Sequence, residues 1–408
     1  MSNTAPTGLS REVRRARLAV SAFFFTNGLM IATLVPHFPG IKAELGLSNT
    51  LYGVAIAAIP TGAIIAGPFA GAVIRKLGSA GTGLLFTIIA ACALVTVPLA
   101  NHVGALMGIF LILGASDAIT DVGQNAHGLR VQRAYGRSII NTFHAIWSIG
   151  AVTGGALAGA SIALNIPRTT HIAVAATLVV ITFLWAYTNR LPGNDTTATT
   201  TNHTPTEPQP ATQQLTTHTA LILLALVAIG ITGALVEDTG STWTALYLRE
   251  SLGTTAATAS LGYIALIGAQ FIGRILGDRA VDAWGLRTVN RTGALLIVTG
   301  MTLALAIPSL TTAIIGFALA GYGSATLVPA AMQAADELPG LKPGTGLTIV
   351  SWLMRLGFLA SPPIVGALAD GFSLRVGLLV LPIAGAAAVV LAHVFPGKQP
   401  RTVTEVSP

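Results

Sequence analysis

Three polar residues interrupt an apolar stretch of the chain at helical spacing. Asp117, Asp121 and Asn125 are four residues apart from one another, so they share one face of a helix. A carboxyl group in such a helix can take up and release a proton. Asp121 is therefore the first candidate for a proton-carrying residue, and Asp117 is the second. The alternative is a structural polar network between helices, and Asn125 fits either interpretation.

The next apolar run, 138–167, carries a second polar face. Asn141, His144 and Ser148 repeat at about one helical turn and could meet the face that carries Asp121. His144 could carry a proton, or it could act only as a hydrogen-bonded spacer between helices. Asn125, Asn141 and His144 are candidates for contacting a substrate.

The segment around residues 237–243 offers two adjacent acids and an indole. Neighbouring residues point about 100° apart on a helix, so we expect only Glu237 to face a central cavity fully. Glu237 is the third candidate for proton coupling, and Asp238 is kept as a substrate contact. Trp243 could stack on a sugar or simply line a helix interface. Asn27 and His37, in the first apolar run, complete this group of candidates.

Arg355 is the only basic residue inside an apolar segment. A helix that enters the bilayer near Thr345 places Arg355 about 15 Å deep, in a hydrocarbon core about 30 Å thick. A guanidinium at that depth needs a carboxylate, carbonyls or an anionic substrate as its partner. We expect it to hold a substrate carboxylate or phosphate, or to pair with Glu237. The alternative is a permanent ion pair that only fixes helix packing.

The composition explains where such residues must lie. The chain has 408 residues, of which 9% are charged and 52% are hydrophobic, and its mean hydropathy is +0.73. Soluble domains carry about 25% charged residues, so a soluble fold is excluded. Most of the chain must face lipid or other apolar helices.

Charge-free runs of membrane length, together with two segments that contain a few polar residues, 220–248 and 345–369, predict twelve transmembrane helices. Single helices are expected at 18–41, 45–74, 138–167, 169–189, 220–248, 251–273, 345–369 and 376–397. The runs 77–116 and 292–335 are too long for one crossing. Each contains a break, at 98–102 and at 308–312, so each predicts two helices.

The basic residues predict the orientation. Of the 22 Lys and Arg residues, only Lys42, Arg168, Arg249 and Arg375 fall on the side away from the termini, while Arg355 is inside a helix. The other 17 share the side of both termini. The positive-inside rule therefore predicts cytoplasmic termini in an inner (cytoplasmic) membrane, and the scattered positive charge does not indicate nucleic acid.

The chain also repeats itself. Glu44 and Gly46 return as Glu250 and Gly253, Gly78 returns as Gly285, and the stretch 155–158 returns as 366–369. These nearly constant offsets indicate a duplication. We therefore expect a fold of two pseudo-symmetric six-helix bundles.

A polar stretch rich in Thr, Pro and Gln separates these two predicted bundles. The predicted segments are a cytoplasmic N-terminal segment (1–17), the first bundle (18–189), a disordered cytoplasmic linker (190–217), the second bundle (218–396) and a cytoplasmic tail (397–408).

The segment 273–285 resembles the signature loop of major facilitator superfamily transporters, and the resemblance extends over essentially the whole chain. The stretches 121–125, 143–148, 243–247 and 357–363 resemble the fucose-permease-like bacterial branch. The resemblance implies the major facilitator fold and a gating loop that contains Gly273, Arg274, Asp278, Arg279 and Asp282. His37, Thr242 and Arg355 depart from that branch, which implies a different substrate.

These observations together favour a secondary transporter and not an enzyme. It would move a small polar solute, sugar-like or an organic anion, by alternating access with proton coupling. A proton-driven exporter of a metabolite or drug is one alternative, and a membrane-embedded enzyme or sensor is an alternative of another class.

Several kinds of site and partner are absent from this prediction. The chain lacks a phosphate loop and a zinc-binding His pair, and Cys92 is its one cysteine. No metal, cofactor or obligate protein partner is expected, so the predicted partners are the solute, protons and the lipid bilayer.

Overall fold

The structure is a computed structural model that describes residues 11–136, 139–193, 216–341 and 345–397. These residues form helices joined by short turns, with no strand among them. Twelve helical spans in this part of the chain are long and apolar enough to cross a membrane. The predicted all-α membrane architecture is confirmed.

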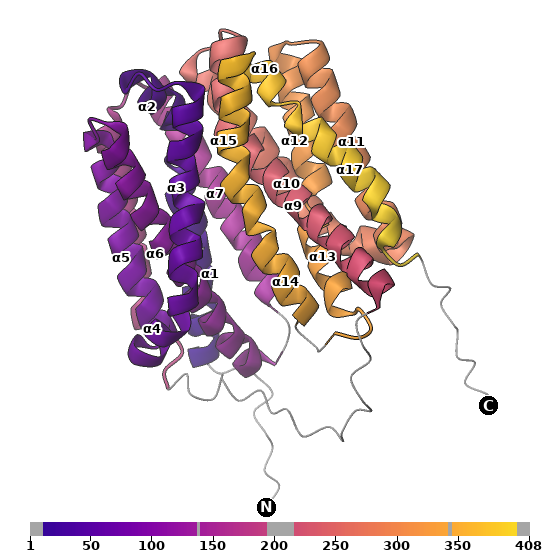
Figure 1. Ribbon diagram of the computed structural model, residues 1–408. Coiled ribbons are helices and arrows are strands. Elements are labelled where there is room, and N and C mark those ends of the chain that lie inside the picture. Colours follow the sequence, from indigo (N-terminus) through magenta and orange to yellow (C-terminus); the bar gives the residue numbers. More distant parts are fainter. Residues whose placement is uncertain (1–10, 137–138, 194–215, 342–344, 398–408) are drawn as a thin grey trace, which may run out of the picture.

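The helices of the first half form one side of the molecule in Figure 1. They are α1 (Arg11–Ala32), α2 (Phe38–Glu44), α3 (Asn49–Ala66), α4 (Ala70–Leu77), α5 (Ser79–Thr96), α6 (Val103–Tyr135), α7 (Ile140–Ala163) and α8 (Arg168–Thr188). Short 3-10 turns follow α1, α3 and α5.

The helices of the second half form the other side. They are α9 (Thr217–Leu246), α10 (Ala256–Trp284), α11 (Leu286–Ala306), α12 (Leu310–Ser324), α13 (Leu327–Asp336), α14 (Thr345–Leu353), α15 (Arg355–Gly371), α16 (Leu374–Gly377) and α17 (Val380–Leu391). A π-helical turn, Tyr247–Ser251, extends α9.

The breaks expected within the two longest apolar runs are present. A 3-10 turn at Val97–Leu99 separates α5 from α6. The ring of His102 caps the start of α6, where its Nδ1 accepts a hydrogen bond from the backbone N of Ala105. Ser309 begins α12 with a capping box that it shares with Thr312. Proline removes a backbone donor and Ser satisfies one, so both breaks follow from the sequence.

Glycines at equivalent places in the two halves share an unusual backbone conformation. Gly46 and Gly253 have φ angles of 61° and 65°, and Gly78 and Gly285 have φ angles of 72° and 83°. Residues with a Cβ rarely adopt positive φ. The halves therefore repeat the same backbone geometry at the places where the sequence repeats.

The two most extensive helix contacts between the halves are those of α3 with α15 and of α7 with α10. The repeated glycines lie in these seams. A Cβ on Gly366 would lie 2.4 Å from the backbone O of Asn49, and a Cβ on Gly155 would lie 2.6 Å from the ring of Tyr263. Small residues let helices approach this closely.

Polar contacts between the halves gather at the end of the molecule away from the two termini, where Figure 1 shows α2 and α16. Lys42 forms a 2.7 Å ion pair with Glu250. The carboxylate of Asp370 accepts hydrogen bonds from the backbone N of Asn49 (2.9 Å) and Thr50 (2.7 Å). We call this end of the interface the closed end and the opposite end the open end.

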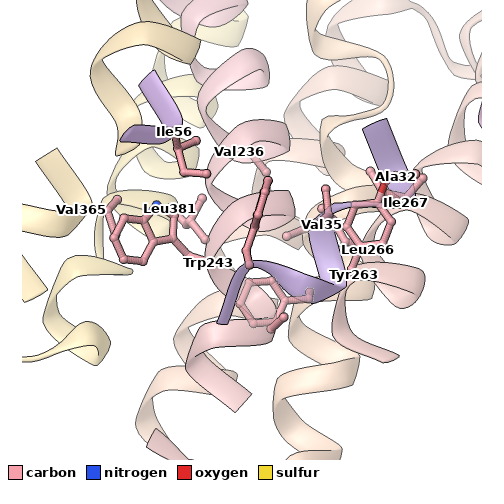
Figure 2. Packing of buried hydrophobic residues seen from close by; sticks show 14 of the residues in the cluster. Ala32, Val35, Ile56, Val236, Trp243, Tyr263, Leu266, Ile267, Val365 and Leu381 are labelled. Carbon is pink, nitrogen blue, oxygen red and sulfur yellow. The ribbon is translucent and has the colours of Figure 1, made fainter. Parts of the chain in front are cut away.

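Buried hydrophobic side chains fill the closed part of the interface. Figure 2 shows Tyr263 beside Ala32 and Val35, and Trp243 near Ile56 and Val365, so residues of both halves mix in one cluster.

Candidate functional site

A cavity of about 280 Å³ lies between the two halves. Five residues predicted from the sequence line it. They are Asn27, Asp117, Glu237, Asp238 and Arg355. The cavity therefore brings together ionisable side chains from helices that are distant in the sequence.

A chain of hydrogen bonds leads from the first half into the cavity. The indole Nε1 of Trp147 donates to Oδ1 of Asn27 (2.7 Å), and Nδ2 of Asn27 donates to Oδ1 of Asp117 (2.8 Å). The bonds connect α7, α1 and α6. Gly28 allows this approach, because a Cβ there would lie 2.2 Å from the backbone O of Trp147. Asn27 and Trp147, the residues of this hydrogen-bond chain that hold the Asp117 carboxyl group in place, are both neutral.

In the second half, the carboxylate of Glu237 is held by the cation of Arg274 and by an amide. Oε2 of Glu237 accepts from Nε2 of Gln270 (2.8 Å) and from Nη2 of Arg274 (3.1 Å). Gln270 and Arg274 are one turn apart on α10, so they reach the same carboxylate from one helix face. Glu237 pairs with Arg274 and not with Arg355.

Asp238 has a different set of partners. Its Oδ2 accepts from Oγ of Ser361 (2.9 Å), and the Ser361 hydroxyl also lies 2.6 Å from Oγ1 of Thr239. Both Glu237 and Asp238 line the cavity. The expectation that only Glu237 would face it is wrong, since the cavity wraps around more than one face of α9.

Arg355 is the first residue of α15. It lines the cavity, which fits the expectation that it contacts the substrate. Helix α15 is separated from α14 by a break at Met354. Within the described residues, Arg355 makes no hydrogen bond or ion pair. It is close enough to Asp117 and Asp121 to interact with both electrostatically. Its guanidinium is available to a ligand.

Asp121 lies one turn from Asp117 toward the open end of the interface, outside the cavity lining. Its Oδ1 accepts from Nδ2 of Asn125 (2.9 Å) and from Nε2 of Gln124 (3.3 Å), and the residue is exposed. His144 is exposed too, and it interacts electrostatically with Asp121 and Arg274. The predicted meeting of the two polar faces is present, but it lies beside the cavity. The side chain of Asn141 is outside the described part.

Two sequence candidates lie in other surroundings. His37 is buried in the turn after α1, where its Nε2 lies 3.1 Å from Nδ1 of His171. Trp243 is 0% exposed, and its ring meets that of Tyr52 edge-on at 5.0 Å. Neither lines the cavity, because each packs on the side of its helix that faces neighbouring helices. Trp243 has the packing role that was the alternative to stacking on a sugar.

The segment predicted as a gating loop is helical. Gly273, Arg274, Arg279 and Asp282 all belong to α10, which ends only at Trp284. The helix continues through Gly273 and Gly277, where the missing side chains allow close packing against a neighbouring segment. A Cβ on Gly273 would lie 2.6 Å from Cβ of Ala325. Arg279 and Asp282 are exposed, whereas the side chain of Asp278 is outside the described part.

Sequence reasoning missed several lining residues, among them Trp147, Ser241, Tyr263 and Phe358. Only spacing offered a signal for another omitted residue, Gln270, since it lies four residues before Arg274 in an otherwise apolar run. Aromatic residues such as Trp147 have no pattern that separates a cavity wall from a helix interface. The described residues hold no cluster of three His, Cys, Asp or Glu side chains suited to a metal ion.

Curated relatives match almost the full chain. An uncharacterized MFS-type transporter of Yersinia pestis is 28% identical over 388 residues, which cover 94% of this chain and 96% of that protein. The membrane protein MosC of Rhizobium meliloti is 29% identical over 382 residues, which cover 92% of this chain and 89% of that protein.

Solved transporters share the fold at low sequence identity. A point mutant of the nucleoside transporter NupG has a TM-score of 0.73 at 14% identity, over 93% of this chain and 98% of that one. A D-xylose-proton symporter has a TM-score of 0.73 at 15% identity, over 93% of this chain and 96% of that one. The architecture of two six-helix bundles is thus a known transporter fold.

The family model of the Major Facilitator Superfamily matches two overlapping stretches, residues 20–280 and 237–407. Together with the relatives and the fold, this match shows that the chain belongs to the Major Facilitator Superfamily and is a membrane transporter, not an enzyme.

Proposed function

We propose that this transporter carries a small polar solute by alternating access and uses the proton gradient to drive it. The observation that supports this most is the cavity between the halves, lined by Asp117, Glu237, Asp238 and Arg355. Alternating access requires a site between two bundles that open at one end at a time. Contacts gathered at one end of the interface fit a state that is closed there and open at the other end.

The orientation of that state follows from the charge bias. With both termini in the cytoplasm of a bacterial inner membrane, the closed end with Lys42 and Glu250 faces outward. The cavity would then communicate with the cytoplasm. The division into bundles at 18–189 and 218–396, with a linker at 190–217, belongs to this proposal, and most of the linker is outside the described residues.

The proton would be carried by a carboxyl group in the first half. Asp117 lines the cavity and accepts a hydrogen bond from Asn27. A change in the charge of Asp117 would therefore alter the electrostatic potential where a solute binds. Asp121 lies one turn closer to the open end and is the second candidate. Glu237 is a weaker candidate than either, because its carboxylate is already in an ion pair with Arg274.

The solute would be recognised from both halves. Arg355 has the planar guanidinium that holds a carboxylate or phosphate with two parallel hydrogen bonds. Trp147 and Phe358 add aromatic surface to the same cavity. This combination favours an organic anion, with a sugar-like solute second. The D-xylose-proton symporter shares the fold. Membership of the fucose-permease-like branch is part of this proposal, and the four stretches that resemble that branch support it.

Proton coupling is tested in proteoliposomes with an imposed pH gradient, using a solute found by a thermal-shift screen of organic anions and sugars. Asp117→Asn should lose accumulation against a gradient and keep counterflow, because the mutant binds solute without taking up a proton. Glu337→Gln, at an exposed position directly after α13 and away from the cavity lining, is the matched control. Full accumulation by both Asp117→Asn and Asp121→Asn would contradict the proposal.

The alternatives are separated by the same preparation. A proton-driven exporter would move the solute opposite to the proton flux, so loading the solute on either side of the membrane distinguishes import from export. A sensor would bind the solute without any counterflow.

A further inference from the structure

A second hollow, about 460 Å³ in volume, lies where the start of α1 meets the end of α8. Three arginines line it, Arg11, Arg15 and Arg190, with Glu12 as the one acid. The formal charge of these four side chains is therefore positive. This hollow is separate from the central cavity, and the proposed transport does not use it.

Two of the arginines are available to a ligand. Arg11 and Arg15 are four residues apart, so their side chains lie on the same face of α1. Both are exposed, and within the described residues neither makes a hydrogen bond or ion pair. A like-charged pair at this spacing is unfavourable in the absence of an anion.

The third arginine is held in place. The guanidinium of Arg190 lies 4.0 Å from the centre of the Tyr187 ring, and its Nη1 donates to the backbone O of Tyr187 (2.9 Å). Its remaining donors are free to point into the hollow. Thr188 and Asn189 add a hydroxyl and an amide to the lining. The donors present are those that bind phosphate oxygens.

An apolar surface continues from the hollow along both helices. Leu18 follows Arg15 by three residues and is 60% exposed. On α8, Ile181 and Trp185 are 57% and 50% exposed, and Trp185 precedes Asn189 by one turn. A tryptophan at this position is typical of the boundary between lipid tails and headgroups. A ligand bound by the arginines would therefore have apolar surface next to it.

We propose that this hollow binds the phosphate group of an anionic phospholipid, with the acyl chains lying against the exposed apolar face of α1 and α8. The positive-inside rule explains why basic residues are on this side of the membrane, but it does not explain three guanidiniums around one hollow. Basic pockets beside transmembrane helices bind acidic headgroups. The lipid would stabilise the contact between the first and sixth membrane spans.

The test is a titration by native mass spectrometry of the purified full-length transporter with dioleoyl phosphatidylglycerol and, separately, dioleoyl phosphatidylcholine. The test variant is Arg11→Gln/Arg15→Gln/Arg190→Gln. The control, Arg75→Gln/Lys76→Gln/Arg291→Gln, removes the same charge elsewhere on this side. Each basic residue near an acidic headgroup contributes about fivefold in affinity, so we expect the test variant to bind phosphatidylglycerol roughly a hundredfold more weakly. The control should stay within about twofold of the wild type.

Two further variants guard against misinterpretation. Arg11→Gln/Arg15→Gln removes only side chains without a described partner and should lower affinity by about thirtyfold even if the triple variant fails to fold. Glu12→Gln removes a repulsive charge and should tighten phosphatidylglycerol binding. Equal binding of the two lipids, or unchanged binding by the double variant, would overturn the proposal. Displacement of phosphatidylglycerol by about 10 mM inorganic phosphate would also overturn it and would assign the hollow to a soluble anion, at a concentration where weak phosphate sites fill.

Discussion

The two halves of the molecule share their backbone geometry and differ in their polar side chains. Gly46 and Gly78 in the first half have the same positive φ as Gly253 and Gly285 in the second. Each half also contributes glycines to the seams with the other half. The repeated features are thus glycines at positions where a positive φ angle or a close helix contact disfavours any side chain.

The side chains that face the cavity are not repeated. In the first half, Asp117 is held by the amide of Asn27, which Trp147 orients in turn. In the second half, Glu237 is held by Arg274, and Arg355 adds a second cation. An acid with neutral partners can change its charge at lower cost than an acid paired with a cation. This difference supports the proposal that Asp117 in the first half carries the proton and that Arg355 in the second half recognises an anion.

Arg355→Lys should produce the largest effect on transport. Lysine keeps the charge and loses the planar fork, so one of two charge-assisted hydrogen bonds to an anionic solute is lost, and we expect uptake in proteoliposomes to fall at least about tenfold. Arg291→Lys on the exposed start of α11 is the control. Uptake by Arg355→Lys above half of the wild-type rate would reduce Arg355 to a residue that fixes helix packing.

Gly366→Ala should destabilise the closed seam more than Gly155→Ala does. The new Cβ on residue 366 meets the backbone of α3, which cannot move alone, whereas the one on residue 155 meets the ring of Tyr263. Overpacking of this kind costs about 1–3 kcal/mol, and the molecule can relieve it by opening the closed end.

The opening is measured by cross-linking Lys42→Cys to Glu250→Cys with a short bismaleimide, in a background without Cys92. We expect Gly366→Ala to lower the yield at least about threefold, corresponding to a shift of less than 1 kcal/mol in the equilibrium, and Gly155→Ala to lower it less. Equal yields in the two variants would show that the seams are energetically equivalent.

Glu237→Gln and Asp117→Asn should differ in their effect on stability. The first leaves Arg274 without its ion pair, and we expect a loss of about 1–2 kcal/mol, whereas asparagine at 117 still accepts the bond from Asn27 and should change stability by less than about 0.5 kcal/mol. Thermal unfolding in one detergent measures both. The double variant Glu237→Gln/Arg274→Gln should recover part of the loss, and a loss as large in Asp117→Asn would remove the contrast between the halves.

Cutting the linker should have the smallest effect. Helix contacts such as those of α3 with α15 hold the halves together, so a protease site inserted within residues 190–217 should leave the cleaved halves associated and transport within about twofold of the uncut protein. Size-exclusion chromatography and uptake after cleavage check this. Separation of the halves in mild detergent would show that the seams alone are too weak.

The sequence by itself determined the helical membrane fold, the twelve spans and their breaks. These depend on local properties: the length of an apolar run, the missing donor of proline at 98 and 308, and the capping of α12 by Ser309. It also singled out Arg355 and Asp117 as ionisable residues among apolar ones, and both line the cavity. The free-energy cost of placing a charged side chain in an apolar helix can be estimated from the sequence alone, without knowing which residues surround it in the fold.

Tertiary structure alone decided which partner each polar group has. From the sequence we considered Arg355 as the partner of Glu237, whereas the packing of α9 on α10 brings Glu237 to Arg274. Trp147 enters the site and Trp243 is buried in the core, although both are tryptophans in apolar helices. A helix has one side facing the cavity and others facing its neighbours, and its rotation is set by close contacts such as Gly28 on Trp147. Those contacts join residues more than a hundred positions apart, and no local pattern encodes them.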